Sequence, residues 1–204
     1  MIKLFCLAVL LATSTWCGKV YAQHLPIPCS PELESVFQSD MELMKESLTT
    51  FIGDVEGDDS RANGLMVRWL GARDSQDAST LLQRIKDIVD FAFLTTPMCF
   101  PFEGTPDAEG EFVVAQVLSD SLYLYLLGDY FELEAEGRFS RAGTLLHELL
   151  HLELFGATNS EFEDVYGIGE VLELAASQPE LAQDNSRNWE MMFNEFVTGE
   201  TFSN

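Results

Sequence analysis

The sequence predicts an α+β fold that is mainly α, with a small β-sheet and one helix that carries a His-Glu-x-x-His motif. Apolar residues recur at helical spacing over residues 33–48 and 79–93, which indicates two amphipathic helices. Two short runs rich in Val, Leu and Tyr, Phe112–Leu118 and Leu122–Leu126, are typical of strands. The motif follows them, at residues 147–151.

Residues 1–22 are expected to form a cleaved secretory signal peptide. Lys3 gives a short basic start, and the apolar run that follows, Leu4 to Ala12, is too short to span a bilayer. The segment ends in Val20-Tyr21-Ala22, a plausible cleavage point. The remaining residues, 23–204, suit a single secreted domain, and no later apolar run is long enough for a membrane span.

The chain is strongly acidic, with 11 basic and 34 acidic residues and a formal net charge of −23. Lys3 and Lys19 leave with the signal peptide, so 9 basic residues would remain against 34 acidic ones, a net charge of −25. Phosphate binding requires a basic surface, so a nucleic-acid partner is excluded and an anionic membrane surface is disfavoured. We expect a monomer whose charge maintains solubility or attracts cationic substrate segments.

Four cysteines are present, and two of them, Cys6 and Cys17, lie in the signal peptide. The other two, Cys29 and Cys99, most simply form one disulfide in a secreted chain. Such a bond would stabilise the fold by roughly 4 to 5 kcal/mol in the chain-entropy model.

Local signals place the boundaries of the elements before the motif. Ser30 is the expected cap of the first helix, and Pro31 suits its first turn. The acidic, glycine-bearing stretch Gly53–Gly64 is expected to be a loop. A second helix is expected over Ser79–Phe93, ended by Pro97.

A loop is then expected over Met98–Gly110, before the two strands. Asp120-Ser121 is the expected turn between these strands. An edge strand beside a metal would be a natural place for an extended peptide to pair.

The motif helix offers two imidazoles on one face, because His147 and His151 are four residues apart. Zinc accepts neutral imidazoles and keeps a position for water in catalytic sites, and Glu148 is placed to take a proton from that water. Ser140 is the expected cap of this helix, and Gly156 fits its end. The alternative is a core helix with two satisfied histidines.

The third zinc ligand must come from a residue after His151. The candidate carboxylates are Glu153, Glu161, Glu163, Asp164, Glu170 and Glu173. A glutamate from the following helix, Glu170 or Glu173, would change the geometry of the site but not the class of reaction.

Three blocks together resemble the deuterolysin-like zinc endopeptidases, or aspzincins, which include fungal peptidyl-lysine metalloendopeptidases. The blocks are Arg141 to His151 (RAGTLLHELLH), the acidic step that ends at Tyr166-Gly167, and Asn185 to Phe193 (NSRNWEMMF). They cover the C-terminal half of the chain. The resemblance implies a zincin-like fold, mainly helical with a small sheet.

The family implies an aspartate as third ligand and a tyrosine that polarises the scissile carbonyl. The family spacing Asp-x-x-Tyr-Gly places Glu163 at the ligand position, whereas Asp164 has the right residue type one position later. We favour Asp164 and keep Glu163 as the alternative. Tyr166 matches the carbonyl-polarising tyrosine, with Tyr123 and Tyr125 as weaker competitors.

Lysine-selective relatives receive the substrate lysine on acidic residues of the third block. Glu190 matches one of these residues and is the expected substrate-binding residue. The other position holds Arg187, which would oppose a cation. The resemblance therefore leaves lysine selectivity open for this chain.

We expect a secreted zinc metalloendopeptidase that hydrolyses peptide or protein substrates by a metal-activated water, with Glu148 as general base. One alternative is a secreted zinc-binding protein or effector that keeps the fold without proteolysis, although an intact Glu148 argues against it. The other is a structural or inhibitory protein that carries the motif by accident.

Overall fold

The computed structural model describes residues 27–100, 114–117, 122–152 and 165–203. The expected signal peptide and the expected turn at Asp120-Ser121 lie outside these ranges, as do Gly156, Glu163 and Asp164. None of the described helices is both long enough and apolar enough to cross a membrane.

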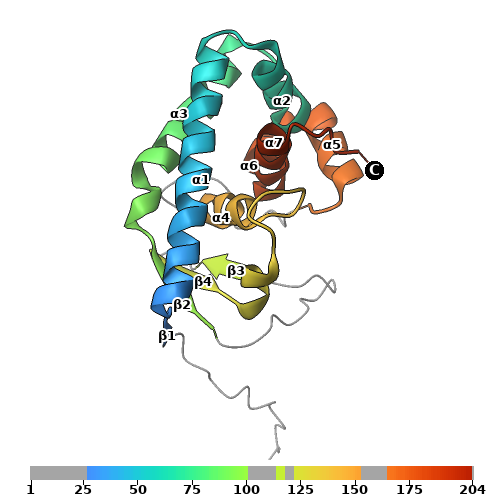
Figure 1. Cartoon of the computed structure of the whole chain (residues 1–204). Helices are drawn as coiled ribbons and strands as arrows, with labels where there is room; N and C mark the ends of the chain where they lie inside the picture. The colour runs from blue at the N-terminus through green and yellow to red at the C-terminus, as the bar shows by residue number, and fades with distance from the viewer. Residues whose placement is uncertain (1–26, 101–113, 118–121, 153–164, 204) are drawn as a thin grey trace, which may run out of the picture.

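The fold is mainly helical with a small sheet, as the sequence predicts (Figure 1). Two 3-10 helices accompany the main elements, η1 (Ala92–Leu94) and η2 (Gly128–Glu132). The strands are β1 (Ile27–Pro28), β2 (Thr96–Cys99), β3 (Ala115–Val117) and β4 (Tyr123–Leu126). The helices are α1 (Pro31–Glu56), α2 (Ser60–Leu70), α3 (Ser75–Phe91), α4 (Arg141–Leu150), α5 (Ile168–Ser177), α6 (Pro179–Asp184) and α7 (Ser186–Thr198).

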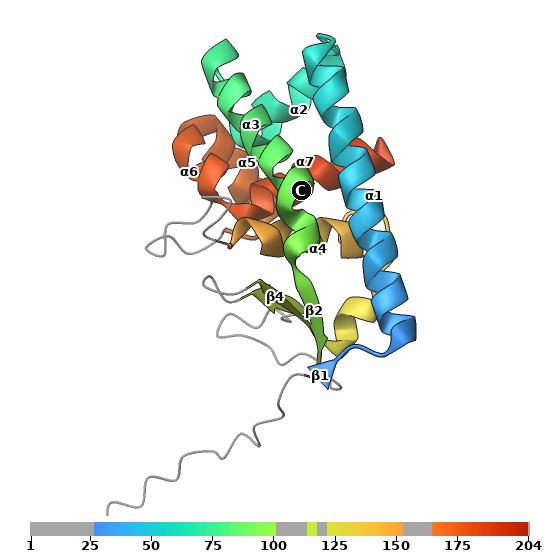
Figure 2. The ribbon, with the colours of Figure 1, turned by 90° about the vertical axis from the view of Figure 1, so that its left-hand side faces the viewer.

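The described strands form one sheet in the order β1-β2-β4-β3. β2 and β4 are parallel, while β1 and β3 pair antiparallel with their neighbours. Figures 1 and 2 show the sheet at one end of the molecule, with α4 next to it and α1 running alongside both. α4 therefore packs directly on the sheet, where it contacts β3.

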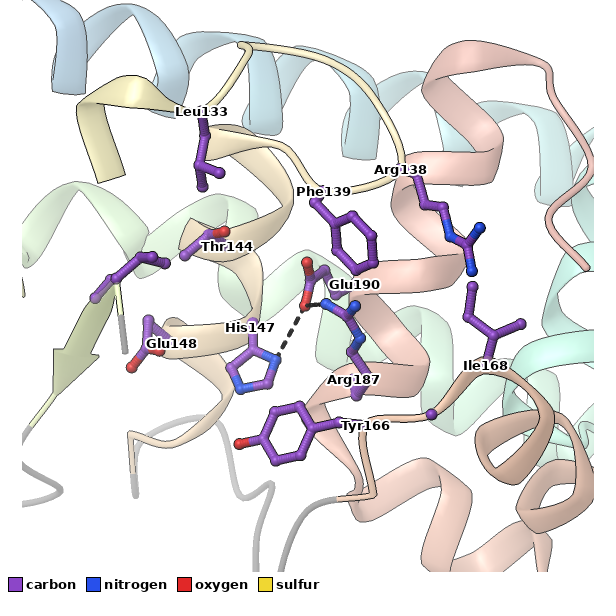
Figure 3. Close-up of a pocket in the computed structure, with 13 residues that line it drawn as sticks. Leu133, Arg138, Phe139, Thr144, His147, Glu148, Tyr166, Ile168, Arg187 and Glu190 are labelled. Carbon is purple, nitrogen blue, oxygen red and sulfur yellow. Dashed lines mark ion pairs between the residues drawn. The ribbon is translucent and has the colours of Figure 1, made fainter. Parts of the chain in front are cut away.

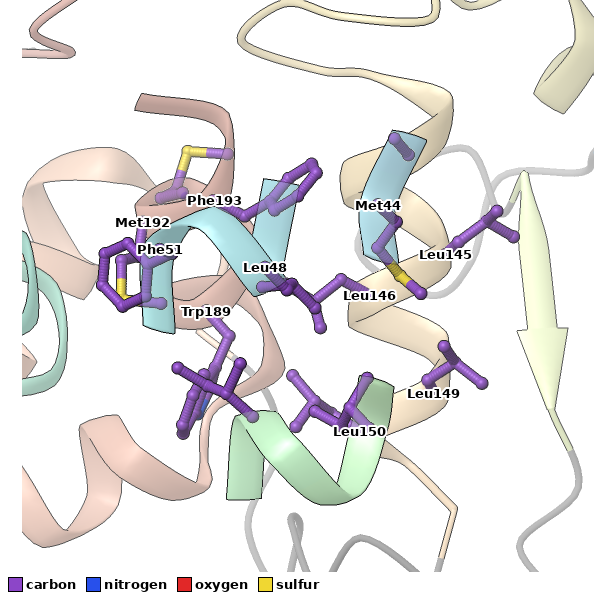
Figure 4. Packing of buried hydrophobic residues seen from close by; sticks show 14 of the residues in the cluster. Met44, Leu48, Phe51, Leu145, Leu146, Leu149, Leu150, Trp189, Met192 and Phe193 are labelled. Carbon is purple, nitrogen blue, oxygen red and sulfur yellow. The ribbon is translucent and has the colours of Figure 1, made fainter. Parts of the chain in front are cut away.

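The core forms where α1, α4 and α7 pack together (Figure 4). Buried side chains at this junction include Met44, Leu48, Phe51, Leu145, Leu146, Leu149, Leu150, Trp189, Met192 and Phe193. The start of α1 agrees with the sequence prediction, since Ser30 accepts a hydrogen bond from the Leu33 amide. α4 begins after Ser140, also as predicted.

The prediction of a loop over Gly53–Gly64 is wrong, because α1 continues to Glu56 and α2 begins at Ser60. Asp59 accepts hydrogen bonds from the first amides of α2, and burial of the apolar face of α2 outweighs its internal Gly64. An aspartate that looks like part of an acidic loop is thus a helix cap.

Asp74 caps α3 in the same way, and α3 therefore begins at Ser75. It ends at Phe91, so both of its bounds differ from the predicted Ser79–Phe93. The loop predicted from Met98 is also wrong at its start, because Met98 and Cys99 belong to β2. These two residues form a strand because they pair with β1 and β4, and this pairing cannot be predicted from the local sequence.

The predicted disulfide is confirmed, and it joins Cys29, before α1, to Cys99, at the end of β2. The strand predictions are confirmed in their described parts, as β3 and β4.

A close approach fixes the start of α4 against α7. Ser140 accepts a hydrogen bond from the Gly143 amide and donates one to Asn194 Oδ1. The amide of Asn194 donates to the Arg138 carbonyl at 3.0 Å. A Cβ at Gly143 would lie 2.4 Å from Asn194 Oδ1, so the two helices can approach this closely only with glycine there.

We predict opposite effects of alanine at two helical glycines. Gly143→Ala must displace the hydrogen-bonded Asn194 amide, which should lower the free energy of unfolding by about 1–3 kcal/mol. A Cβ at Gly64 in α2 would have no atom within 4 Å, so Gly64→Ala should raise the free energy of unfolding by about 0.5–1 kcal/mol. Urea denaturation measures both, and equal effects of the two substitutions would contradict the close approach.

Candidate metal centre and pocket

α4 presents His147 and Glu148, and His151 is the residue that caps its C-terminus. The helix ends at Leu150, earlier than the predicted stop at Gly156, because its last amides bond three residues back, His151 to Glu148 and Leu152 to Leu149. His151 keeps helical dihedral angles, so the two histidine rings stay on one side with centroids 4.9 Å apart.

A carboxylate from α7 lies against the first histidine. Glu190 Oε2 is 3.2 Å from His147 Nδ1 and 2.6 Å from Arg187 Nη1. Burial alone would raise the pKa of Glu190, but Arg187 and His147 outweigh burial and hold the pKa below its ordinary value. The ionised carboxylate is suited to orient the imidazole of His147 through Nδ1, leaving Nε2 for another partner.

His151 is held in its neutral form. Burial, with a smaller contribution from His147, lowers the pKa of His151 to about 4. Ser186 Oγ lies 3.4 Å from His151 Nε2. Neutral imidazole is the form that binds a metal, so this ring is ready to ligate at ordinary pH.

The motif faces a pocket of about 510 Å³. Figure 3 shows His147 with Glu148 on one side and Glu190 and Arg187 of α7 on the other, and with Tyr166 next to its ring. The Tyr166 ring stacks against His147 with centroids 5.9 Å apart. The lining is Val114, Ala115, Leu133, Arg138, Phe139, Thr144, His147, Glu148, Tyr166, Gly167, Ile168, Arg187 and Glu190.

Asn185 holds the segment that carries Tyr166. Its side chain accepts a hydrogen bond from the Val165 amide at 3.0 Å and donates one to the Val165 carbonyl at 3.1 Å. The same amide group donates to Asn188 Oδ1, and Asn188 in turn donates to the carbonyls of Trp69 and Val171. Tyr166 is thereby tied to the buried framework through its neighbour.

The donors present fit a zinc ion in part. Two imidazoles on one side, one of them oriented by a buried carboxylate, match the nitrogen ligands that zinc prefers. The predicted third ligands, Asp164 and Glu163, lie outside the described residues. Within the described ranges, no three metal-ligating side chains come together, so neither Glu170 nor Glu173 of α5 joins the two histidines.

The structure adds residues that the sequence patterns did not single out as part of the site. Phe139 and Arg138 line the pocket from the segment before α4, and Thr144 lines it from α4. No sequence pattern marks Arg138 and Phe139, whereas the helical spacing of Thr144 from His147 could have placed it on the same face. Asn185 stands in a block that the resemblance covers, but its contact with Val165 follows only from the fold.

We predict that Asn185→Ala releases the backbone at Val165. The Val165 amide should exchange its hydrogen at least about tenfold faster, since it loses its hydrogen bond to Asn185 Oδ1, while amides of α1 stay protected. Asn185→Asp keeps the acceptor for that amide and should cause a smaller change. Unchanged exchange at Val165 in the alanine variant would show that Asn185 does not hold this segment.

Known proteins match the chain in sequence and in fold. A family model described as lysine-specific metallo-endopeptidase, that of the aspzincins, matches residues 56–194. Over 136 residues the chain is 32% identical to an extracellular protease of Aeromonas hydrophila, covering 64% of this chain and 36% of that protein. The chain thus spans about a third of the length of this relative.

The fold is similar to that of a zinc peptidase from Grifola frondosa, with a TM-score of 0.66 and 24% identity over 82% of this chain and 97% of the other. The family model covers well over half of the chain, and the fold agrees with it. The chain therefore belongs to the aspzincin family of zinc metalloendopeptidases.

Proposed function

We propose that this chain is a secreted zinc endopeptidase in which Glu148 is the general base. The observation that carries this proposal is the shared pocket, because His147, Glu148 and Tyr166 line one cavity with His151 beside them. A bound zinc ion would supply Lewis-acid chemistry, lowering the pKa of a water molecule and polarising the peptide carbonyl. The ligands would be His147, His151 and a carboxylate from Asp164 or Glu163, with Asp164 favoured.

The remaining chemistry belongs to side chains of the chain. Glu148 accepts the proton of the attacking water and returns it to the leaving amine. The phenol of Tyr166 donates a hydrogen bond to the carbonyl oxygen as negative charge develops on it. The ionised Glu190 keeps His147 in one orientation throughout.

The sheet offers a place for the substrate backbone. β3 stands at the end of the described sheet, and the pocket is lined by its first residue, Ala115, and by Val114 just before it. An extended peptide paired with β3 would pass the motif helix, since α4 lies beside this sheet (Figure 1). Secretion is supported by the signal-like residues 1–22, the disulfide and the extracellular relative.

We predict that mature wild-type protein loaded with zinc cleaves a denatured protein substrate, and that Glu148→Gln does not. Loss of the general base should lower the rate by about 10²–10⁴-fold. Mass spectrometry of the products measures this, with zinc content determined for both proteins. If a folded, zinc-loaded wild type cleaves nothing, the proposal is wrong and the chain is a zinc-binding protein without proteolytic activity.

Glu190→Gln should weaken zinc binding by about 10–100-fold, because the neutral amide orients His147 less strongly. Competition with a chromophoric chelator measures the affinity. Glu173→Gln on the exposed face of α5 is the matched control and should bind zinc as the wild type does. Equal zinc affinities of the wild type and Glu190→Gln would show that Glu190 does not orient His147.

A further inference from the structure

Cationic side chains line one part of the pocket of a chain whose net charge is −23. Arg187 comes from α7, and Arg138 precedes Phe139 on the segment before α4 (Figure 3). Both guanidinium groups lie over the Phe139 ring, at 4.7 Å for Arg187 and 5.5 Å for Arg138. We call these three residues the arginine arm of the pocket.

Arg187 is buried, with 9% of its surface exposed, and is only partly satisfied. Its one ion pair within the described ranges is Nη1 with Glu190, and its buried Nε has no hydrogen-bond partner there. A guanidinium carries five N–H donors in a planar fork. An unsatisfied buried donor costs free energy, so a ligand acceptor in the pocket would be favoured.

Glu190 is not free to receive a substrate cation. Oε2 of this carboxylate already contacts both Arg187 Nη1 and His147 Nδ1. The Arg187–Glu190 pair is neutral as a unit, and Arg138 adds a positive charge. A substrate lysine on this side of the pocket would therefore meet two guanidinium groups, and the carboxylate of Glu190 there is already paired.

We propose that the arginine arm binds a carboxylate of the substrate, either an Asp or Glu side chain next to the scissile bond or the C-terminal carboxylate. This inference rests on the proposed function and names its substrate class. Carboxylates match the guanidinium fork with charge-assisted hydrogen bonds. The selectivity of this chain thus differs from the lysine specificity in the description of its family.

The acidic surface of the chain does not oppose this preference at contact distance. At physiological salt the charges of exposed groups are screened beyond about 8 Å. The arginine arm acts within hydrogen-bond distance, and the burial of Arg187 reduces its screening. The local charge of the pocket therefore decides which side chain is accepted.

The test compares matched peptides with zinc-loaded mature protein. One series carries Asp, Glu, Gln or Lys next to the cleaved bond with amidated ends, and a second lacks acidic side chains but has a free or an amidated C-terminus. We expect kcat/KM to be highest for acidic peptides in the first series or for the free terminus in the second, which identifies the source of the carboxylate. Arg187→Gln should lower that preference by about tenfold or more.

The control Arg73→Gln removes an exposed arginine that pairs with Glu180 and does not line the pocket, and should keep the preference. Arg187→Lys keeps the positive charge and should retain part of the preference for carboxylate peptides. Circular dichroism and zinc content of each variant show that it is folded and loaded with metal, and its preference is expressed relative to its own cleavage of the Gln peptide. Preference for lysine, or none for any carboxylate, would overturn the inference.

Binding separates failure of this inference from failure of the proposed function. Fluorescence anisotropy of the same peptides on zinc-loaded Glu148→Gln protein needs no turnover. Tighter binding of acidic or free-terminus peptides that depends on Arg187 would support the arginine arm even if the wild type cleaves nothing. Equal binding of Lys, Gln and acidic peptides would overturn it.

Discussion

The packing of α4 on α7 is the constraint on which the candidate site depends. Gly143 leaves room for the Asn194 amide, whose hydrogen bonds tie α7 to Ser140 and Arg138. At this separation Glu190 reaches His147 Nδ1. A bulkier residue at the contact would move the histidine away from the carboxylate that orients it, even though the motif itself would be unchanged.

One buried carboxylate serves two parts of the pocket. Glu190 faces His147 on one side and Arg187 on the other, and a buried charge is tolerated only with such partners. Because they share this group, the orientation of a candidate metal ligand and the charge of the arginine arm are physically coupled. A carboxylate bound at Arg187 would compete for its guanidinium and leave more of the charge of Glu190 to His147.

Local signals in the sequence predicted the parts of the fold that local chemistry decides. The Ser30 cap of α1, the start of α4 and the cysteine pair needed no tertiary information, and the structure confirms them. The loop over Gly53–Gly64 was wrong because the Asp59 cap shows only once α2 is buried. Glu190 matched a substrate-binding position, but its contact with His147 depends on the packing of two helices.

The start of α7 explains why a short block of sequence carries so much of the resemblance. Asn185 holds the Tyr166 segment, Ser186 lies beside His151, and Glu190 contacts His147. Each of these side chains reaches a different part of the pocket from one stretch of backbone. Changes in this block can alter the pocket without altering the His-Glu-x-x-His motif. Arg187 is such a position, because it lines the pocket with a cation where the resemblance implies an acidic residue.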